Sequence, residues 1–255
     1  MTRFFDGTKK FLPGLWLNSG SETAAEIAAQ AGFEWLLIDC EHGLITESAL
    51  LSLLRTISGY NVVPVVRIPS ADSPLLERAL DFGAGGIMVP GVETSRQAAK
   101  ISARMQYPPH GCRGVASSVR AADYGLCFQS YFCEAGSKLA LICQIETRSG
   151  VENAEEIAAL NAVTGLFIGH SDLSMNLGCF GDWDSPAVKD AEDTVLQACR
   201  TYHKLPGMLL KNGQSAESFR QKGFRMIALG SDSGLLKSGC ARLLDVSRNS
   251  GTTEI

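Results

Sequence analysis

The segment Asp39-Cys40-Glu41-His42 follows directly after the apolar run at 35–38. An imidazole changes its charge near neutral pH, and a carboxylate close to it can orient the ring for proton transfer. We therefore predict that His42 moves protons and that Asp39, three residues earlier, orients its ring.

Polar side chains also follow other apolar runs of the chain. They are Arg67 after 62–66, Gln144 and Glu146 at the end of 139–146, and His170, Ser171 and Asp172 after 165–169. Two carboxylates, Glu146 and Asp172, are hard ligands that suit Mg²⁺ or Mn²⁺, with water and substrate completing the coordination. A metal there could chelate a 2-oxo acid and stabilise its enolate, and Arg67 could neutralise the developing oxyanion.

Each of these residues also has a purely structural interpretation. Asp39 could cap a helix, Glu146 could pair with Arg148 or Arg67, and His170 could be a satisfied structural histidine. The functional interpretation depends on their recurrence behind several different apolar runs.

Eight apolar runs must position these groups. They span 15–19, 35–39, 62–68, 86–90, 139–146, 165–169, 207–210 and 226–230. Most are continuous rather than alternating, which is typical of parallel strands buried on both faces. Eight strand–helix units in 255 residues predict a (β/α)8 TIM barrel, whose chemistry lies at the carboxyl ends of the strands. The alternative is a doubly wound sheet, but no G-x-G-x-x-G follows the first run.

Residues 1–255 contain no linker, so we predict one domain. The segment 107–137 is rich in Gly, Ser, Pro and aromatic residues, and it is predicted to be a long loop that forms an ordered lid over the site.

The composition limits the possible partners. A net charge of −4 argues against nucleic acid as the main partner, because phosphate binding needs a basic surface. The first residues contain no secretory h-region, and no stretch is apolar enough to span a membrane. Eight cysteines without a C-x-x-C pair predict reduced thiols in a cytoplasmic protein.

Six segments together resemble the HpcH/HpaI aldolase family of metal-dependent, class II pyruvate aldolases. They are IDCEHG, VVRIP, LDFGAGGIMVPGVET, YPPHGCRGV, QIET and FIGHSDLSMNLG, and the resemblance covers roughly 13–240. The family includes 4-hydroxy-2-oxoheptanedioate aldolase and 2-dehydro-3-deoxy sugar-acid aldolases.

The resemblance implies a barrel whose last helix is swapped between subunits, commonly in a hexamer. It implies a divalent metal (Mg²⁺, Mn²⁺ or Co²⁺) on Glu146 and Asp172 and a proton-transfer pair of Asp39 and His42. It also implies that Arg67 binds the keto oxygen of pyruvate and that Gln144 lines the pocket. The loop of Gly169 and Ser171 would hold the pyruvate carboxylate, and Asp81 would approach the site of a neighbouring subunit.

The chain departs from the family at His170, where the family usually has proline, and it carries Lys211 after the run at 207–210. An imine mechanism would need a lysine at this end of the barrel. Lys138 precedes its strand, and Lys211 lies beside the turn signal Asn212-Gly213, which predicts an exposed loop. We therefore expect the metal-dependent route.

The predicted reaction is reversible cleavage of a 4-hydroxy-2-oxo acid to pyruvate and an aldehyde through a metal-bound pyruvate enolate. The alternatives are decarboxylation of oxaloacetate, or a related enolate-forming reaction, and a barrel without catalytic activity.

Overall fold

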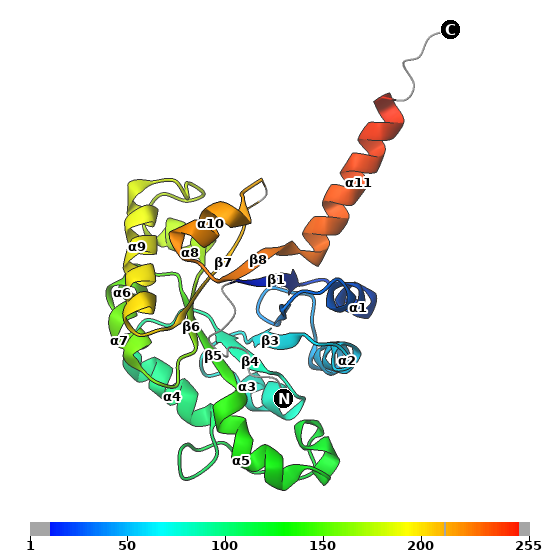
Figure 1. Ribbon diagram of the computed structural model, residues 1–255, viewed down its shortest axis with the longest axis vertical. Helices are drawn as coiled ribbons and strands as arrows, with labels where there is room; N and C mark the ends of the chain where they lie inside the picture. The colour runs from blue at the N-terminus through cyan, green and yellow to red at the C-terminus, as the bar shows by residue number, and fades with distance from the viewer. Residues whose placement is uncertain (1–10, 212, 250–255) are drawn as a thin grey trace.

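The computed structural model describes residues 11–211 and 213–249 of the chain. Eight parallel strands form a closed barrel in which each strand pairs with the next and β8 pairs with β1 (Figure 1). The strands are β1 Leu12–Leu17, β2 Trp35–Asp39, β3 Val63–Arg67, β4 Gly86–Val89, β5 Ala140–Ile145, β6 Gly165–Ile168, β7 Leu205–Leu209 and β8 Met226–Ser231. The predicted TIM barrel is confirmed, although the first strand begins three residues earlier than expected.

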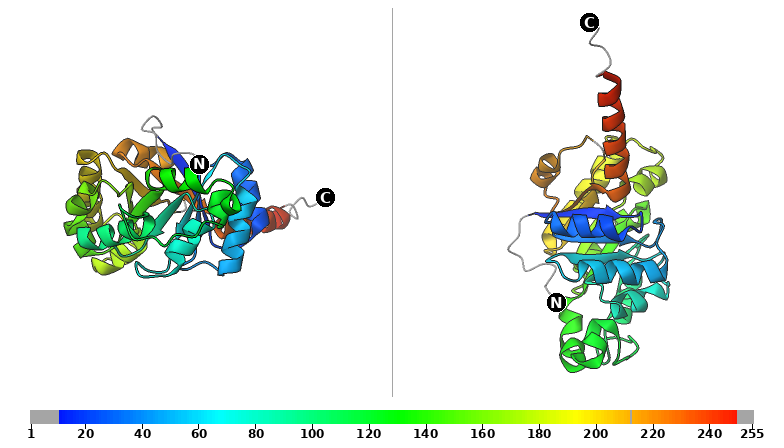
Figure 2. Two further views of the ribbon diagram at one scale, coloured as in Figure 1. Left: turned by 90° about the horizontal axis from the view of Figure 1, so that it is seen from below. Right: turned by 90° about the vertical axis from the view of Figure 1, so that its right-hand side faces the viewer.

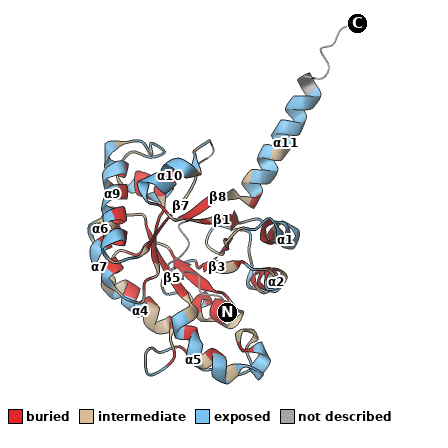
Figure 3. Ribbon diagram, viewed as in Figure 1, coloured by how far each residue is buried: buried red, intermediate tan, exposed pale blue. Residues whose placement is uncertain are grey.

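Helices alternate with the strands. They are α1 Glu22–Gln30, α2 Glu47–Ile57, α3 Leu75–Asp81, α4 Ser95–Met105, α5 Phe128–Lys138, α6 Arg148–Glu152, α7 Ala154–Ala159, α8 His170–Asn176, α9 Pro186–Thr201, α10 Ala216–Lys222 and α11 Asp232–Asn249, with a 3-10 segment η1 at Arg120–Gly125. Local signals start several of them: the Ser185 hydroxyl accepts from the Val188 amide, and Pro186 follows at the first helical position. Figure 3 shows buried strands surrounded by helices that are exposed on their outer sides.

Large side chains fill the interior of the barrel. Trp35 and Phe167 meet edge to face, with their ring centroids 6.3 Å apart. Gly14 and Gly207 make this packing possible, because an added Cβ would lie 2.0 Å from the Trp35 ring and 2.4 Å from the Phe167 ring, respectively. The barrel is therefore a packed core, and its chemistry is confined to the rim.

The segment 107–137 differs from its prediction as a long loop and lid. It lies between α4 and β5, and it contains η1 and nearly all of α5 rather than one long loop. A helix-to-strand connection lies at the amino-terminal end of a barrel, opposite the predicted site. The segment instead packs on the end of α3, where Arg120 donates to the Phe82 carbonyl at 2.6 Å and Tyr131 to the Leu80 carbonyl at 3.5 Å.

The last helix, α11, extends away from the barrel in both Figure 1 and the right-hand view of Figure 2. Its start is fixed by Asp232, whose carboxylate accepts from the Asn18 amide at 3.1 Å. Further along the helix, Leu236 and Leu243 are 70% and 71% exposed, and Leu229 on β8 is 41% exposed. No helix within the described residues has the length and apolar character needed to cross a bilayer.

Candidate active site

Asp39 and Arg67 form the centre of the rim, where β2 and β3 end side by side. Arg67 donates from Nε and Nη2 to the two oxygens of Asp39, at 2.9 Å and 2.8 Å. Trp16 donates its indole N–H to Asp39 at 3.1 Å and lies 4.9 Å from the Arg67 guanidinium. Burial acts to raise the pKa of Asp39, but the hydrogen bonds and charge of Arg67, together with Trp16, outweigh it and lower that pKa.

The structure therefore corrects the predicted contact between Asp39 and the His42 ring. Asp39 accepts from the backbone amide of His42 at 3.2 Å, whereas the imidazole is 71% exposed. The carboxylate nearest to the ring is Glu41, whose Oε1 lies 3.7 Å from His42 Nε2. Glu41 also forms an ion pair with Arg67 Nη1 at 2.9 Å, so the guanidinium lies between two carboxylates.

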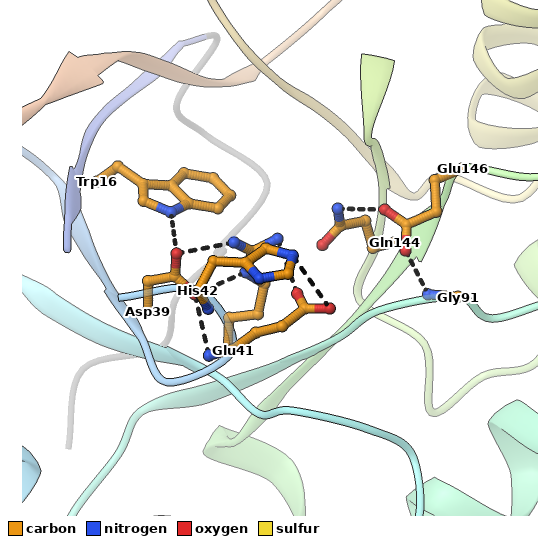
Figure 4. Close-up of polar contacts among 8 residues, drawn as sticks. Trp16, Asp39, Glu41, His42, Gly91, Gln144 and Glu146 are labelled. Carbon is orange, nitrogen blue, oxygen red and sulfur yellow. Dashed lines mark hydrogen bonds and ion pairs between the residues drawn. The ribbon is translucent and has the colours of Figure 1, made fainter. Parts of the chain in front are cut away.

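Glu146 faces this group from the other side of the opening (Figure 4). It accepts from the Gly91 amide at 2.8 Å and from the side-chain amide of Gln144. Burial and the charge of Asp172 raise the pKa of Glu146 to about 7, with a smaller contribution from Glu41. Glu146 and Asp172 are thus close enough to repel each other, as expected for ligands of one cation.

Asp172 is carried by α8, which starts immediately after β6. The helix buries Leu173 and Ser174 and leaves Ser171 and Asp172 exposed. Gly169, which precedes the helix, lies against Glu146, because an added Cβ would be 2.4 Å from Glu146 Oε2 and 2.7 Å from Gln144 Nε2. The close approach of Gly169 brings the β5 and β6 ends together at one site.

His170 turns away from this opening. It is 3% exposed, its Nε2 lies 2.7 Å from Glu192 Oε1 on α9, and its ring stacks on Trp183 at 4.7 Å between centroids. This placement agrees with the structural interpretation of His170 and not with a ligand or acid–base group at the rim. The residue is part of the packing between α8 and α9.

Two other residues lie apart from the rim groups. Asp81 ends α3 at the amino-terminal end of the barrel, where it accepts from Arg113 at 2.7 Å. Asp81 therefore lies at the end of the barrel opposite to the rim groups of its own chain. Lys211 is exposed as expected, with its Nζ 5.6 Å from the Trp183 ring. The predicted turn residue Asn212 lies outside the described residues.

Cys40 lies beside the carboxylates, and its surroundings favour the protonated thiol. Burial, followed by the charges of Asp39 and Glu47, raises the pKa of its thiol to about 12. Sequence reasoning assigned no role to Trp16 or Glu41. Glu41 was within the charged run and Trp16 within the first apolar run, but nothing in the sequence indicated that both contact Arg67.

The rim fits a divalent cation with few protein ligands. Among the described residues there is no group of three or more His, Cys, Asp or Glu side chains that could hold a metal ion. Glu146 and Asp172 nevertheless supply two hard oxygen donors, and the raised pKa of Glu146 reflects negative charge that a cation would neutralise. Water and substrate oxygens would have to complete the coordination.

Comparison with known proteins identifies the family. The HpcH/HpaI aldolase/citrate lyase family model matches residues 12–238. The chain belongs to the HpcH/HpaI aldolase/citrate lyase family. Among its relatives, the hydroxypyruvate/pyruvate aldolase of Chromohalobacter salexigens is 39% identical, with 96% of this chain and 95% of that protein covered.

A 5-keto-4-deoxy-D-glucarate aldolase of Klebsiella pneumoniae is 34% identical, with 91% of this chain and 90% of that protein covered. The crystal structure of a HpcH/HpaI family protein from Burkholderia cenocepacia superposes with a TM-score of 0.91 at 37% identity, covering 96% and 97% of the two chains. The chain is thus an enzyme of the aldolase class, and the resemblance noted from its motifs is confirmed.

Proposed function

We propose that this HpcH/HpaI enzyme reversibly cleaves a 4-hydroxy-2-oxo acid to pyruvate and an aldehyde, with a divalent cation held by Glu146 and Asp172. The observation that carries the proposal is Glu146, which faces Asp39 and Glu41 across the rim (Figure 4) and whose pKa is raised by burial and by the charge of Asp172. The relatives named as pyruvate aldolases support the choice of product. A bound cation would supply Lewis acidity to the 2-oxo group of the substrate.

Arg67 is the proposed contact to the substrate keto oxygen. A guanidinium has five N–H donors. Asp39 accepts two of them and Glu41 faces a third, which leaves two for an oxygen that gains negative charge. Because Asp39 and Glu41 hold the guanidinium in place, little reorganisation is needed when that charge develops.

The carbon–carbon cleavage requires removal of the proton from the 4-hydroxyl group. As the bond between C3 and C4 breaks, its electron pair stays with the pyruvate fragment as the enolate, and the C4 oxygen becomes the aldehyde carbonyl. The His42 ring is the proposed base, since it is exposed at the rim and free to reach a substrate. The enolate then takes up a proton at C3 to form the methyl group of pyruvate.

The substrate carboxylate is proposed to bind at the start of α8, beside Gly169 and Ser171. The first N–H groups of a helix have no partner within the helix and favour anions. Gln144 lies against Gly169 and would border the same pocket. Asp81 is proposed to act in the site of a neighbouring subunit.

We further propose a cytoplasmic homo-oligomer, a hexamer, that exchanges its last helix between subunits. The apolar residues on α11 and the exposed Leu229 on β8 support exchange, because both lack cover within the described chain. The eight cysteines are all free, which supports a reducing compartment.

The deciding experiment incubates purified protein with pyruvate and a panel of aldehydes and scores aldol products by mass. We expect product with Mg²⁺, Mn²⁺ or Co²⁺ and none with EDTA. Exchange of deuterium into the pyruvate methyl group would report enolisation without any aldehyde. A pyruvate adduct trapped by borohydride on Lys211 would refute the metal-dependent route, and faster decarboxylation of oxaloacetate than aldol cleavage would favour the alternative reaction.

A further inference from the structure

The helix that carries Asp172 depends on tertiary contacts for its position. α8 has seven residues, and isolated helices shorter than about 12 residues are marginal in water. Its cap residue Gly169 offers no side chain to hydrogen-bond the first turn. Leu173 and Ser174 are buried in the middle of the helix, whereas Ser171 and Asp172, which precede them in the first turn, are exposed and supply no buried contact.

His170 is the buried residue at the start of that first turn. Its Nε2 lies 2.7 Å from Glu192 Oε1, and Glu192 is itself 4% exposed in the middle of the 16-residue helix α9. Because an ionised carboxylate only accepts hydrogen bonds, Nε2 carries the proton. A hydrogen bond to a buried charge is strong and directional, and the stacked Trp183 ring further restricts the imidazole.

Glu192 is a fixed anchor for this contact. Lys222 on α10 lies 3.4 Å from its second oxygen, so the carboxylate is held between two helices. The contact from His170 thus links the start of α8 to both α9 and α10.

The resemblance places proline at this position in related sequences. Proline at the first helical position pre-sets φ for the helix and needs no side-chain partner. The backbone would accept it here, since Gly169 has φ −86° and ψ 80°, outside the helical region that a following proline disfavours. This chain has instead a side-chain contact at the same point.

We propose that His170 is a positioning residue for Asp172, fastening the first turn of α8 to α9 through Glu192 in place of the restraint that proline would give. The inference rests on the proposed function, because it takes Asp172 as a ligand of the cation. His170 itself touches neither cation nor substrate.

The test measures Mn²⁺ binding to the metal-free, full-length protein by calorimetry. We expect His170→Ala to weaken binding ~10-fold, on the scale of other residues that orient metal ligands. Glu192→Ala should weaken it similarly, and the double variant should be no worse than either single one, because both changes remove one contact. His170→Pro should bind Mn²⁺ nearly as tightly as the wild type.

His110→Ala, a change at an exposed histidine on the opposite end of the barrel, is the matched control and should bind Mn²⁺ normally. A melting curve for each variant separates positioning from general support of the fold. Unchanged Mn²⁺ binding in a folded His170→Ala protein, or equal losses in the alanine and proline variants, would overturn the proposal. If His170→Ala does not fold, Glu192→Ala tests the same contact, because it removes the acceptor and keeps the imidazole.

Asp172→Ala and Glu146→Ala distinguish this inference from the function on which it rests. If neither affects Mn²⁺ affinity, the proposed metal site is wrong. If both abolish binding while the His170 and Glu192 variants bind normally, only the positioning role is overturned.

Discussion

At the scale of single residues, Arg67 has the most constrained surroundings of the rim. Asp39 accepts from it at two atoms, Glu41 pairs with a third, and Trp16 lies against it. We expect Arg67→Lys to lower kcat/KM by about 100-fold, because lysine keeps the charge but cannot form the fork that Asp39 orients. Steady-state aldol cleavage measures the effect, and near-normal rates with an unchanged melting temperature would contradict the role of Arg67 at the keto oxygen.

The His42 ring is exposed, whereas the Arg67 side chain is buried. We expect His42→Ala to lower turnover by roughly 10²-fold, the usual contribution of a general acid or base, with little change in stability. Turnover at saturating substrate and thermal unfolding test the two parts of this prediction. Full turnover in the folded variant would assign the proton transfer to another group, with Glu41 as the next candidate.

Glu146 gives the protein a pH dependence that can be measured without metal. Its folded pKa of about 7 lies above the ordinary 4.5, so the folded state keeps a proton that the unfolded state releases in this range. The stability that this proton contributes is complete below pH 4.5 and is lost as the pH rises through 7.

In EDTA, the urea midpoint of the wild type should therefore fall more between pH 5 and 8 than that of Glu146→Gln, whose amide does not ionise. Parallel pH profiles for the two proteins would show that the carboxylate is not perturbed.

At the scale of elements, the contact between the β5 and β6 ends depends on Gly169. Its φ of −86° is open to alanine, so Gly169→Ala introduces a steric change without backbone strain. The new Cβ would lie 2.4 Å from Glu146 Oε2, and the carboxylate or Gln144 must move.

We expect Gly169→Ala to bind Mn²⁺ ~10-fold more weakly. Gly59→Ala is the control, because a Cβ at Gly59 meets nothing within 4 Å. Equal Mn²⁺ affinity in Gly169→Ala and the wild type would show that the site adapts to the added methyl group.

Helix patterning was predicted less well than strand patterning. In the sequence, the helical spacing of Ala24, Ile27, Ala28 and Ala31 predicts an apolar face for α1. Of these four residues the structure buries only Ala28, and it leaves Ile27 62% exposed. Alanine-rich helices have a weak periodic signal, because adjacent faces differ little in hydrophobicity. Strands buried on both faces give a stronger signal, and all eight were predicted.

At the scale of the whole molecule, α11 is the element that a single barrel leaves without cover. Burying one leucine side chain stabilises a protein by about 1.5–3 kcal/mol. A monomer would lack this stabilisation at each of the exposed apolar residues of α11. We expect the double variant Leu236→Asp/Leu243→Asp to dissociate the oligomer, as measured by light scattering.

The double variant Val115→Asp/Leu126→Asp, in the segment between α4 and α5, serves as a charge-matched control, since Val115 and Leu126 are 59% and 90% exposed. A wild-type protein that is monomeric and fully active at working concentration would refute assembly through α11.

The sequence by itself determined the barrel, the rim and the family. Continuous apolar runs specify buried parallel strands, and the residues that end them must meet at one edge, because parallel strands share a direction. That reasoning was enough to bring Asp39, Arg67, Glu146 and Asp172 to one opening.

Only the tertiary structure decided which side chains pair there. Asp39 orients Arg67 rather than the His42 ring, because the guanidinium of β3 lies beside the end of β2, whereas the His42 side chain points outward. His170 packs on Glu192, 22 residues away along the chain, and the segment 107–137 lies at the end opposite to the rim. Spacing along the chain fixes the strand from which a residue emerges, but side-chain direction and long-range partners depend on how the helices pack around the barrel.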